Sequence, residues 1–129
     1  MANTAIKFYK CVECDCIMGM IQTDGCVPSC CGKELKELVP NTVDAAQEKH
    51  VPVVTVNGNT VHVAVGSTVH PMESDHYIQW IYVQTQHGGQ RKVLNSGEKP
   101  EADFALTPDD KLIAVYEYCN KHGLWKVNA

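Results

Sequence analysis

Five side chains in the C-terminal two-thirds of the chain are of types that bind transition metals. They are His50, His70, His76, Cys119 and His122. Neutral imidazoles and a thiolate suit a borderline metal such as iron, whereas structural zinc prefers four ligands in a closed tetrahedron. Five protein ligands leave one position open on a six-coordinate metal, and a thiolate opposite it would donate electron density to the metal. The ligand set therefore indicates a metal site that can react with a small molecule.

Each of these ligands falls at the end of an expected strand or in a loop. The strands are expected at about 51–56, 60–65, 77–85, 91–94, 103–106 and 111–118. Asn57-Gly58-Asn59 is a hairpin signal, and a helical turn is expected only at 44–47. Six or so short strands are typical of an antiparallel β-sandwich, which can gather loop residues at one edge.

The two remaining histidines do not fit a metal site. His62 lies in mid-strand with a parity opposite to Val61 and Val63, so we expect it to face solvent. His87 is expected in a turn.

The cysteines divide the chain into a head, residues 1–37, and a body, residues 38–129. Six of the seven cysteines lie between Cys11 and Cys31, whereas all six histidines lie at or after His50. Cys11-x-x-Cys14, followed later by the adjacent pair Cys30-Cys31, has the spacing of a four-thiolate iron or zinc site. Adjacent cysteines form a strained disulfide, and so small a head needs a metal to stabilise it.

Two further head cysteines leave alternatives open. Cys16 and Cys26 are additional to the expected set. They could be buried thiols, a cross-strand disulfide or alternative metal ligands.

Composition bounds the class of protein. The chain has 129 residues, of which 44% are hydrophobic and 20% charged, with a net charge of −4. The charge does not indicate nucleic acid or an anionic membrane as partner. No apolar run approaches the ~20 residues that span a bilayer, and the first residues lack the apolar stretch of a signal peptide. The expected location is the cytoplasm, where many cysteines are more often metal ligands than disulfides.

Four motifs carry a resemblance to a known family. They are Glu48-Lys49-His50-Val51-Pro52, Gly66-Ser67-x-x-His70-Pro71-Met72, His76-Tyr77-Ile78-x-Trp80 and Cys119-Asn120-x-His122-Gly123-x-Trp125. From about residue 40 onward the chain resembles the superoxide reductases, the desulfoferrodoxin and neelaredoxin family. The resemblance implies an immunoglobulin-like sandwich with the four histidines equatorial to a non-haem iron and Cys119 axial. It also implies reduction of superoxide to hydrogen peroxide, with electrons from rubredoxin or a similar donor.

The resemblance also assigns roles to Glu48 and Lys49. In the family the glutamate can occupy the sixth position of the oxidised iron, and the lysine lies near the open site. The alternative is a pair of ordinary surface charges. Superoxide is an anion, and a cation about 4 Å away would contribute up to ~4 kcal/mol at an effective dielectric near 20.

The head resembles the desulforedoxin-like head of the two-iron members over roughly residues 6–37. That resemblance implies a rubredoxin-type iron on Cys11, Cys14, Cys30 and Cys31, and it supports a homodimer. Asp15 departs from the family, which usually has glycine there.

Two other functions compete with this hypothesis. A pure electron carrier would use the head iron and would not need a second, five-ligand site. A binding module with structural zinc in both sites would be colourless, whereas ferric-thiolate sites absorb visible light.

Overall fold

The computed structural model describes residues 6–129, which divide into two compact units. The first ends at Val39 and the second runs from Pro40 to Ala129. The head boundary expected from the sequence lies two residues before this division. Each unit is described by itself.

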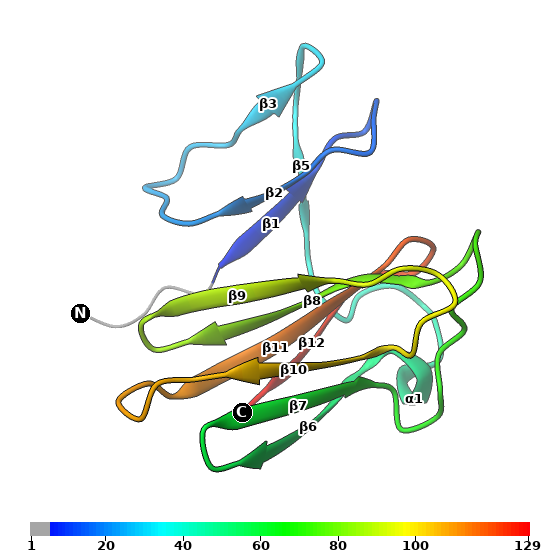
Figure 1. The fold of residues 1–129 in the computed structure, drawn as a ribbon. Helices are drawn as coiled ribbons and strands as arrows, with labels where there is room; N and C mark the ends of the chain where they lie inside the picture. The colour runs from blue at the N-terminus through cyan, green and yellow to red at the C-terminus, as the bar shows by residue number, and fades with distance from the viewer. Residues whose placement is uncertain (1–5) are drawn as a thin grey trace. The chain divides into compact units, whose positions relative to one another are not determined.

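The head unit is built from very short strands (Figure 1). A three-stranded antiparallel sheet has the order β2-β1-β5, and β3 and β4 form a separate hairpin. The strands are β1 (Lys7–Lys10), β2 (Ile17–Met20), β3 (Ser29–Cys30), β4 (Lys33–Glu34) and β5 (Lys36–Leu38). A cluster of Tyr9, Cys11 and Leu35 is buried between them. So small an apolar cluster contributes little stability, which agrees with the expectation that the head depends on a metal.

The second unit is a sandwich of two antiparallel sheets (Figure 1). One sheet has the order β10-β7-β6 and the other the order β12-β11-β8-β9. The strands are β6 (Pro52–Asn57), β7 (Thr60–Val65), β8 (Ile78–Thr85), β9 (Gly88–Val93), β10 (Glu101–Ala105), β11 (Leu112–Cys119) and β12 (Gly123–Asn128). A single helical turn, α1 (Gln47–His50), precedes β6. The expected antiparallel, immunoglobulin-like β-sandwich is therefore confirmed.

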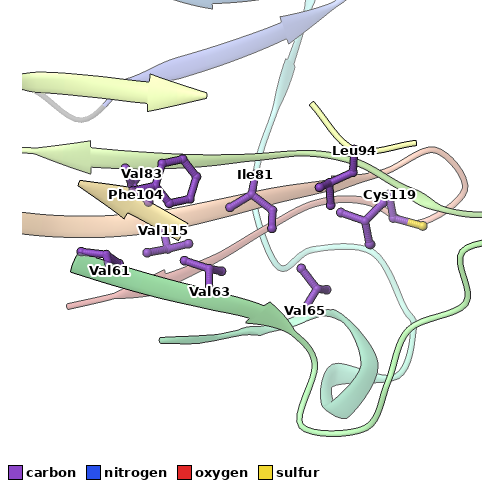
Figure 2. Packing of buried hydrophobic residues seen from close by; sticks show 10 residues of the cluster. Val61, Val63, Val65, Ile81, Val83, Leu94, Phe104, Val115 and Cys119 are labelled. Carbon is purple, nitrogen blue, oxygen red and sulfur yellow. The ribbon is translucent and has the colours of Figure 1, made fainter. Parts of the chain in front are cut away.

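The core lies between the two sheets. On β7 the residues Val61, Val63 and Val65 are buried in alternation, and Ile81 and Val83 of β8 meet them from the other sheet (Figure 2). Burial of each such side chain contributes about 1.5–3 kcal/mol to the free energy of folding. Cys119 lies at the end of this cluster and is fully buried. The apolar core thus extends up to the edge where the candidate ligands were expected.

Three elements differ from the expectation. β12 was not expected. Leu124 and Trp125 are consecutive and both buried, so the segment lacks the alternating pattern of a strand. Its backbone pairing with β11 makes it a strand. β9 begins at Gly88, where a turn was expected, because this strand is exposed along its whole length and carries no burial pattern. The helical turn forms at Gln47–His50 rather than at 44–47.

The segment before α1 is bound through Asn41 to the outer edge of β12. The side chain of Asn41 donates to Lys126 O at 3.1 Å and accepts from Lys126 N at 2.9 Å. The Asn41 backbone N–H donates to Leu124 O at 3.1 Å. Asn41 therefore acts as one more strand residue beside β12. In the described part of the chain, no helix is long and apolar enough to cross a membrane.

Candidate metal centres

Four loops and strand ends bring the five expected body ligands together. His50 ends α1, His70 and His76 lie between β7 and β8, Cys119 ends β11, and His122 lies in the turn before β12. One potential donor atom from each residue lies within 4.8 Å of every other. His50, His70 and Cys119 are buried, and the other two are partly exposed. The cluster therefore lies at one edge of the sandwich with one side near solvent.

The four imidazole rings form a closed square. Ring centroids are 4.7 Å apart for His50 and His70, and 4.9 Å apart for His70 and His76. They are 5.0 Å apart for His76 and His122, and 4.8 Å apart for His122 and His50. Neighbouring rings are inclined by 74° to 88°. Four rings at near-equal spacing around one point can present their nitrogen atoms to a single metal ion.

Two of the rings present unprotonated nitrogens to each other. The Nδ1 atoms of His50 and His70 donate to the carbonyl oxygens of Ala46 and Pro71, at 2.7 and 2.6 Å. Burial lowers the pKa of both rings, that of His70 to about 4, so both are neutral at pH 7. Their Nε2 atoms then carry lone pairs, yet they lie 3.1 Å apart. Two lone pairs at this distance repel each other, and a cation between them would remove the repulsion.

The other two histidines support the same conclusion. Nδ1 of His122 lies 3.0 Å from Nε2 of His50. Nε2 of His76 is buried and has no hydrogen-bond partner within residues 6–129. Two nitrogens at right angles on a metal with bonds of about 2.1 Å would lie about 3.0 Å apart. The donor set therefore fits a single metal ion.

Cys119 supplies a sulfur on the buried side. Its Sγ lies 3.5 Å from Nε2 of His70. Burial raises the pKa of this thiol, although the backbone N–H groups of Lys121 and His122 favour the thiolate. A metal cation would complete the stabilisation of the thiolate that the two N–H groups begin. Four nitrogens and one thiolate are a set that suits iron better than a closed zinc site.

Trp125 supports two of the ligands, a role that sequence reasoning did not assign. Its ring stacks on His50 with centroids 4.9 Å apart and an interplanar angle of 24°. Its indole N–H donates to His122 O at 2.9 Å. Its place at the end of the Cys119–Trp125 motif was the available signal, but sequence spacing cannot show which ring a tryptophan meets.

Glu48 and Lys49 lie on α1 beside the centre, and both are exposed. Burial is the main cause that lowers the pKa of His50, and the charges of neighbouring histidines and of Lys49 lower it further. The backbone of this turn is held by the loop after β7, because Thr68 N–H donates to Glu48 O at 2.9 Å. A cation thus lies next to a buried ligand at the edge of the site.

His62 and His87 lie outside both clusters, as expected. Nδ1 of His62 is 2.6 Å from Asp103 Oδ1, and its Nε2 is 3.3 Å from Glu101 Oε1. This cross-strand group links β7 to β10 on the outer face of the sheet. His87 lies in the turn between β8 and β9, where its backbone N–H donates to Asp110.

The head holds a second cluster, made of Cys11, Cys14, Cys30 and Cys31, whose sulfur atoms all lie within 4.8 Å of one another. The sulfurs of Cys14 and Cys30 are 3.9 Å apart, and those of Cys30 and Cys31 are 3.7 Å apart. Glu13 N–H donates to the sulfur of Cys11 at 3.4 Å and lowers the pKa of that thiol to about 7. Hydrogen bonds with the thiols of Cys31, Cys11 and Cys14 raise the pKa of Cys30, because they favour its protonated form. Separations of 3.7 and 3.9 Å are close to the sulfur–sulfur edge of about 3.8 Å in a tetrahedron with metal–sulfur bonds of about 2.3 Å, so the cluster fits a tetrahedral metal.

The two extra head cysteines are not part of this cluster. Cys16 is partly buried and packs against the head core, whereas Cys26 is exposed. Both are free thiols in the structure.

Comparison with known proteins agrees with the two clusters. The family model described as Desulfoferrodoxin matches residues 42–128. The chain belongs to the desulfoferrodoxin family. It is 42% identical over 123 residues to a desulfoferrodoxin of Nitratidesulfovibrio vulgaris, covering 95% of this chain and 96% of that protein.

Solved structures of the family show the same fold. The superoxide reductase from Treponema pallidum matches with a TM-score of 0.83 and 41% identity, covering 97% of this chain and all of that one (100%). The one-iron superoxide reductase from Giardia intestinalis matches with a TM-score of 0.53 and 30% identity, covering 64% of this chain and 97% of its own. The four-histidine, one-cysteine cluster and the separate four-cysteine cluster are the two sites of the two-iron desulfoferrodoxin type.

Proposed function

We propose that this oxidoreductase reduces superoxide to hydrogen peroxide, with His50, His70, His76, Cys119 and His122 holding the catalytic iron. The square of four imidazoles with one thiolate is the observation that carries the proposal. When bound, the iron would supply the single electron. An external donor such as rubredoxin would return that electron, and no superoxide is oxidised in the cycle.

The protein's own residues would bind the iron and set the protonation state of its ligands. Five protein donors would leave one position of a six-coordinate iron for a small anion. Burial keeps the His50 and His70 rings neutral, which is the form that binds a metal. The N–H groups of Lys121 and His122 hold negative charge on the Cys119 sulfur. A charged thiolate would donate electron density to a bound iron and so favour electron transfer to the substrate.

Lys49 would attract the substrate and position a proton source. Superoxide is an anion, so an exposed cation beside the open side raises the encounter rate, and more so at low ionic strength. Its ammonium group can hold a water that protonates the reduced product. Glu48, on the same turn, would help the product leave.

In the head, Cys11, Cys14, Cys30 and Cys31 would hold a second, rubredoxin-type iron. All four of these ligands lie in the unit that ends at Val39, and the five body ligands lie after it. Each metal would therefore have its complete set of protein ligands within one unit. A homodimer is part of this proposal through the family resemblance.

Pulse radiolysis of the reduced, iron-loaded protein tests the reaction. We expect superoxide to decay much faster than in buffer, with hydrogen peroxide formed and no dioxygen released. Decay at the buffer rate would overturn the proposed activity. His122→Ala is expected to lose the body iron and the activity, whereas a fully active, iron-loaded His122→Ala would overturn the ligand assignment.

Lys49→Ala tests the role of the cation. The rate constant for superoxide is expected to fall roughly tenfold at low salt, and the deficit should shrink as salt rises. Lys49→Arg keeps the charge and should retain most of the rate. Lys111→Ala is the matched control. Lys111 directly precedes the first residue of β11, and Cys119 is the last residue of that strand, so Lys111 lies at the end away from the site. Equal rates for Lys49→Ala and Lys111→Ala would contradict the assignment.

A further inference from the structure

Asn120 makes three hydrogen bonds to the residues on either side of His76. Its Nδ2 donates to Asp75 O at 3.0 Å, and its Oδ1 accepts from Tyr77 N at 3.0 Å. Its own backbone N–H donates to Tyr77 O at 3.3 Å. Both polar atoms of this side chain are therefore used on the peptide groups that flank one ligand. Asn120 itself directly follows another ligand, Cys119.

The backbone of His76 also forms a pair of hydrogen bonds with the backbone of Glu73. His76 N–H donates to Glu73 O at 3.2 Å, and Glu73 N–H donates to His76 O at 2.9 Å. This pair of bonds makes a tight turn but does not attach the turn to the sandwich. Attachment to the Cys119 turn comes through Asn120. Together the bonds leave the backbone at His76 little freedom to rotate.

His76 needs such a support more than His50 and His70 do. The rings of His50 and His70 are each fixed by a bond from Nδ1 to a backbone carbonyl. In the part of the chain that the structure describes, no hydrogen bond holds either nitrogen of the His76 ring. Its buried Nε2 nevertheless belongs to the cluster. Apart from edge contacts with the rings of His70 and His122, the ring is therefore positioned through its backbone.

We propose that Asn120 is a positioning residue that fixes His76 relative to Cys119 and so sets the fourth nitrogen ligand of the body metal. The inference rests on the proposed iron site but not on the reaction with superoxide. Outer contacts that orient metal ligands typically change metal affinity 10- to 100-fold when removed. Removing the Asn120 amide frees the His76 turn, and the metal then spends part of its time with four protein ligands.

A second contact between the same two turns supplies the control. Lys121 Nζ lies 3.9 Å from Asp75 Oδ2, and both side chains are more than half exposed. An exposed ion pair at this distance contributes little to holding a turn. Lys121→Ala thus removes a neighbouring side-chain contact to the same residue, Asp75, and keeps both the Asn120 bonds and the Lys121 backbone N–H that supports the Cys119 sulfur.

The test uses the full-length protein loaded with ⁵⁷Fe. The variants are Asn120→Ala, Asn120→Asp and the control Lys121→Ala. Iron release to a chelator is measured, and Mössbauer spectra distinguish the body iron from the four-cysteine iron. For Asn120→Ala we expect release from the body site to be about 10- to 100-fold faster, with an altered body spectrum and an unchanged head spectrum. Lys121→Ala should stay within about twofold of the unmodified protein.

The conservative variant separates positioning from general stability. Asn120→Asp keeps an acceptor for Tyr77 N–H but loses the donor to Asp75 O and places two oxygens together. It should release iron at an intermediate rate. If Asn120→Ala does not fold, Asn120→Asp alone tests the proposal. Iron release from Asn120→Asp at the rate of the unmodified protein would then overturn it. So would an unchanged body spectrum and release rate in Asn120→Ala.

The outcomes for Asn120 and for the proposed function are distinguishable. If the unmodified protein holds body iron but does not accelerate superoxide decay, the reaction is wrong and the Asn120 comparison still stands. If Asn120→Ala behaves like the unmodified protein while superoxide is reduced, only the positioning role is wrong.

Discussion

At the scale of single residues, the ligands are fixed by different neighbours. His50 and His70 are held by ring bonds to carbonyls, whereas the His76 turn is attached through its backbone. Trp125 combines a stack on His50 with a bond to His122 O. A ligand that is fixed before metal arrives loses less conformational entropy on binding, so these neighbours raise the affinity of the site.

Substitutions of Trp125 can separate its two contacts. Trp125→Phe keeps a ring against His50 but leaves His122 O without its donor, so we expect a loss of about 1 kcal/mol in unfolding free energy. Trp125→Leu also loses the stacking area and leaves a cavity, and should cost about 3 kcal/mol. Denaturant unfolding of the iron-loaded protein measures both. A Leu variant as stable as the Phe variant would show that the stack contributes nothing.

At the scale of elements, the site depends on loops that pack against each other at one edge. α1 is a single turn, too short to be stable alone. The loop after β7 holds it, because Thr68 N–H and the Ser67 hydroxyl both donate to Glu48 O. Gly66 allows this close approach: its φ is +83°, and an added Cβ would lie 2.4 Å from Thr68 O and 2.7 Å from Glu48 O.

Gly66→Ala should therefore disturb the turn that carries Glu48 and Lys49. We expect a loss of about 3 kcal/mol or more, from the left-handed backbone and from the overlap with two carbonyl oxygens. Gly58→Ala is the control, since Gly58 has a φ of +62° but open space around its Cβ position. It should lose only about 1–2 kcal/mol. Equal unfolding free energies for the two variants would contradict the packing role of Gly66.

At the scale of the whole molecule, each unit contains one complete set of ligands. The body has an apolar core of ten buried residues between two sheets, whereas the buried cluster of the head around Tyr9 is much smaller. Stability of the head should then depend on its metal far more than stability of the body does.

Metal content tests the independence of the two sites. Cys14→Ser is expected to lower the iron content from two atoms per chain to one, with the superoxide rate constant unchanged. Cys26→Ser, a substitution of an exposed head cysteine outside the cluster, should leave both irons in place. Elemental analysis with a visible spectrum measures this. Loss of iron from Cys26→Ser would instead make Cys26 an alternative ligand.

A fragment of residues 40–129 tests the body unit alone. All five body ligands and the sandwich core lie within it, so it should fold and bind one iron. The match of the one-iron protein from Giardia intestinalis to 64% of the chain agrees with this expectation. Circular dichroism and iron analysis provide the measurement, and an unfolded fragment would show that the body needs the head.

Much of the sandwich could be predicted from residue patterns. Alternating valines in β7 and the hairpin signal before it indicate a half-buried strand, because side chains of a strand point to opposite faces in turn. β12 and β9 could not be predicted, since consecutive burial in one and complete exposure in the other remove that period. Their strand conformation comes from backbone pairing with β11 and β8.

By itself, the sequence determined the chemical types available for metal binding, because the identity of a ligand atom does not depend on the fold. It also determined that His62 and His87 do not join the site, through strand parity and turn chemistry. Only the tertiary structure decided that four rings form a square, and which contacts from Asn120 and Trp125 hold them. Apart from the bond between Trp125 and His122 O, those contacts join residues more than 40 positions apart, such as Asn120 and Tyr77, and local spacing carries no information about them.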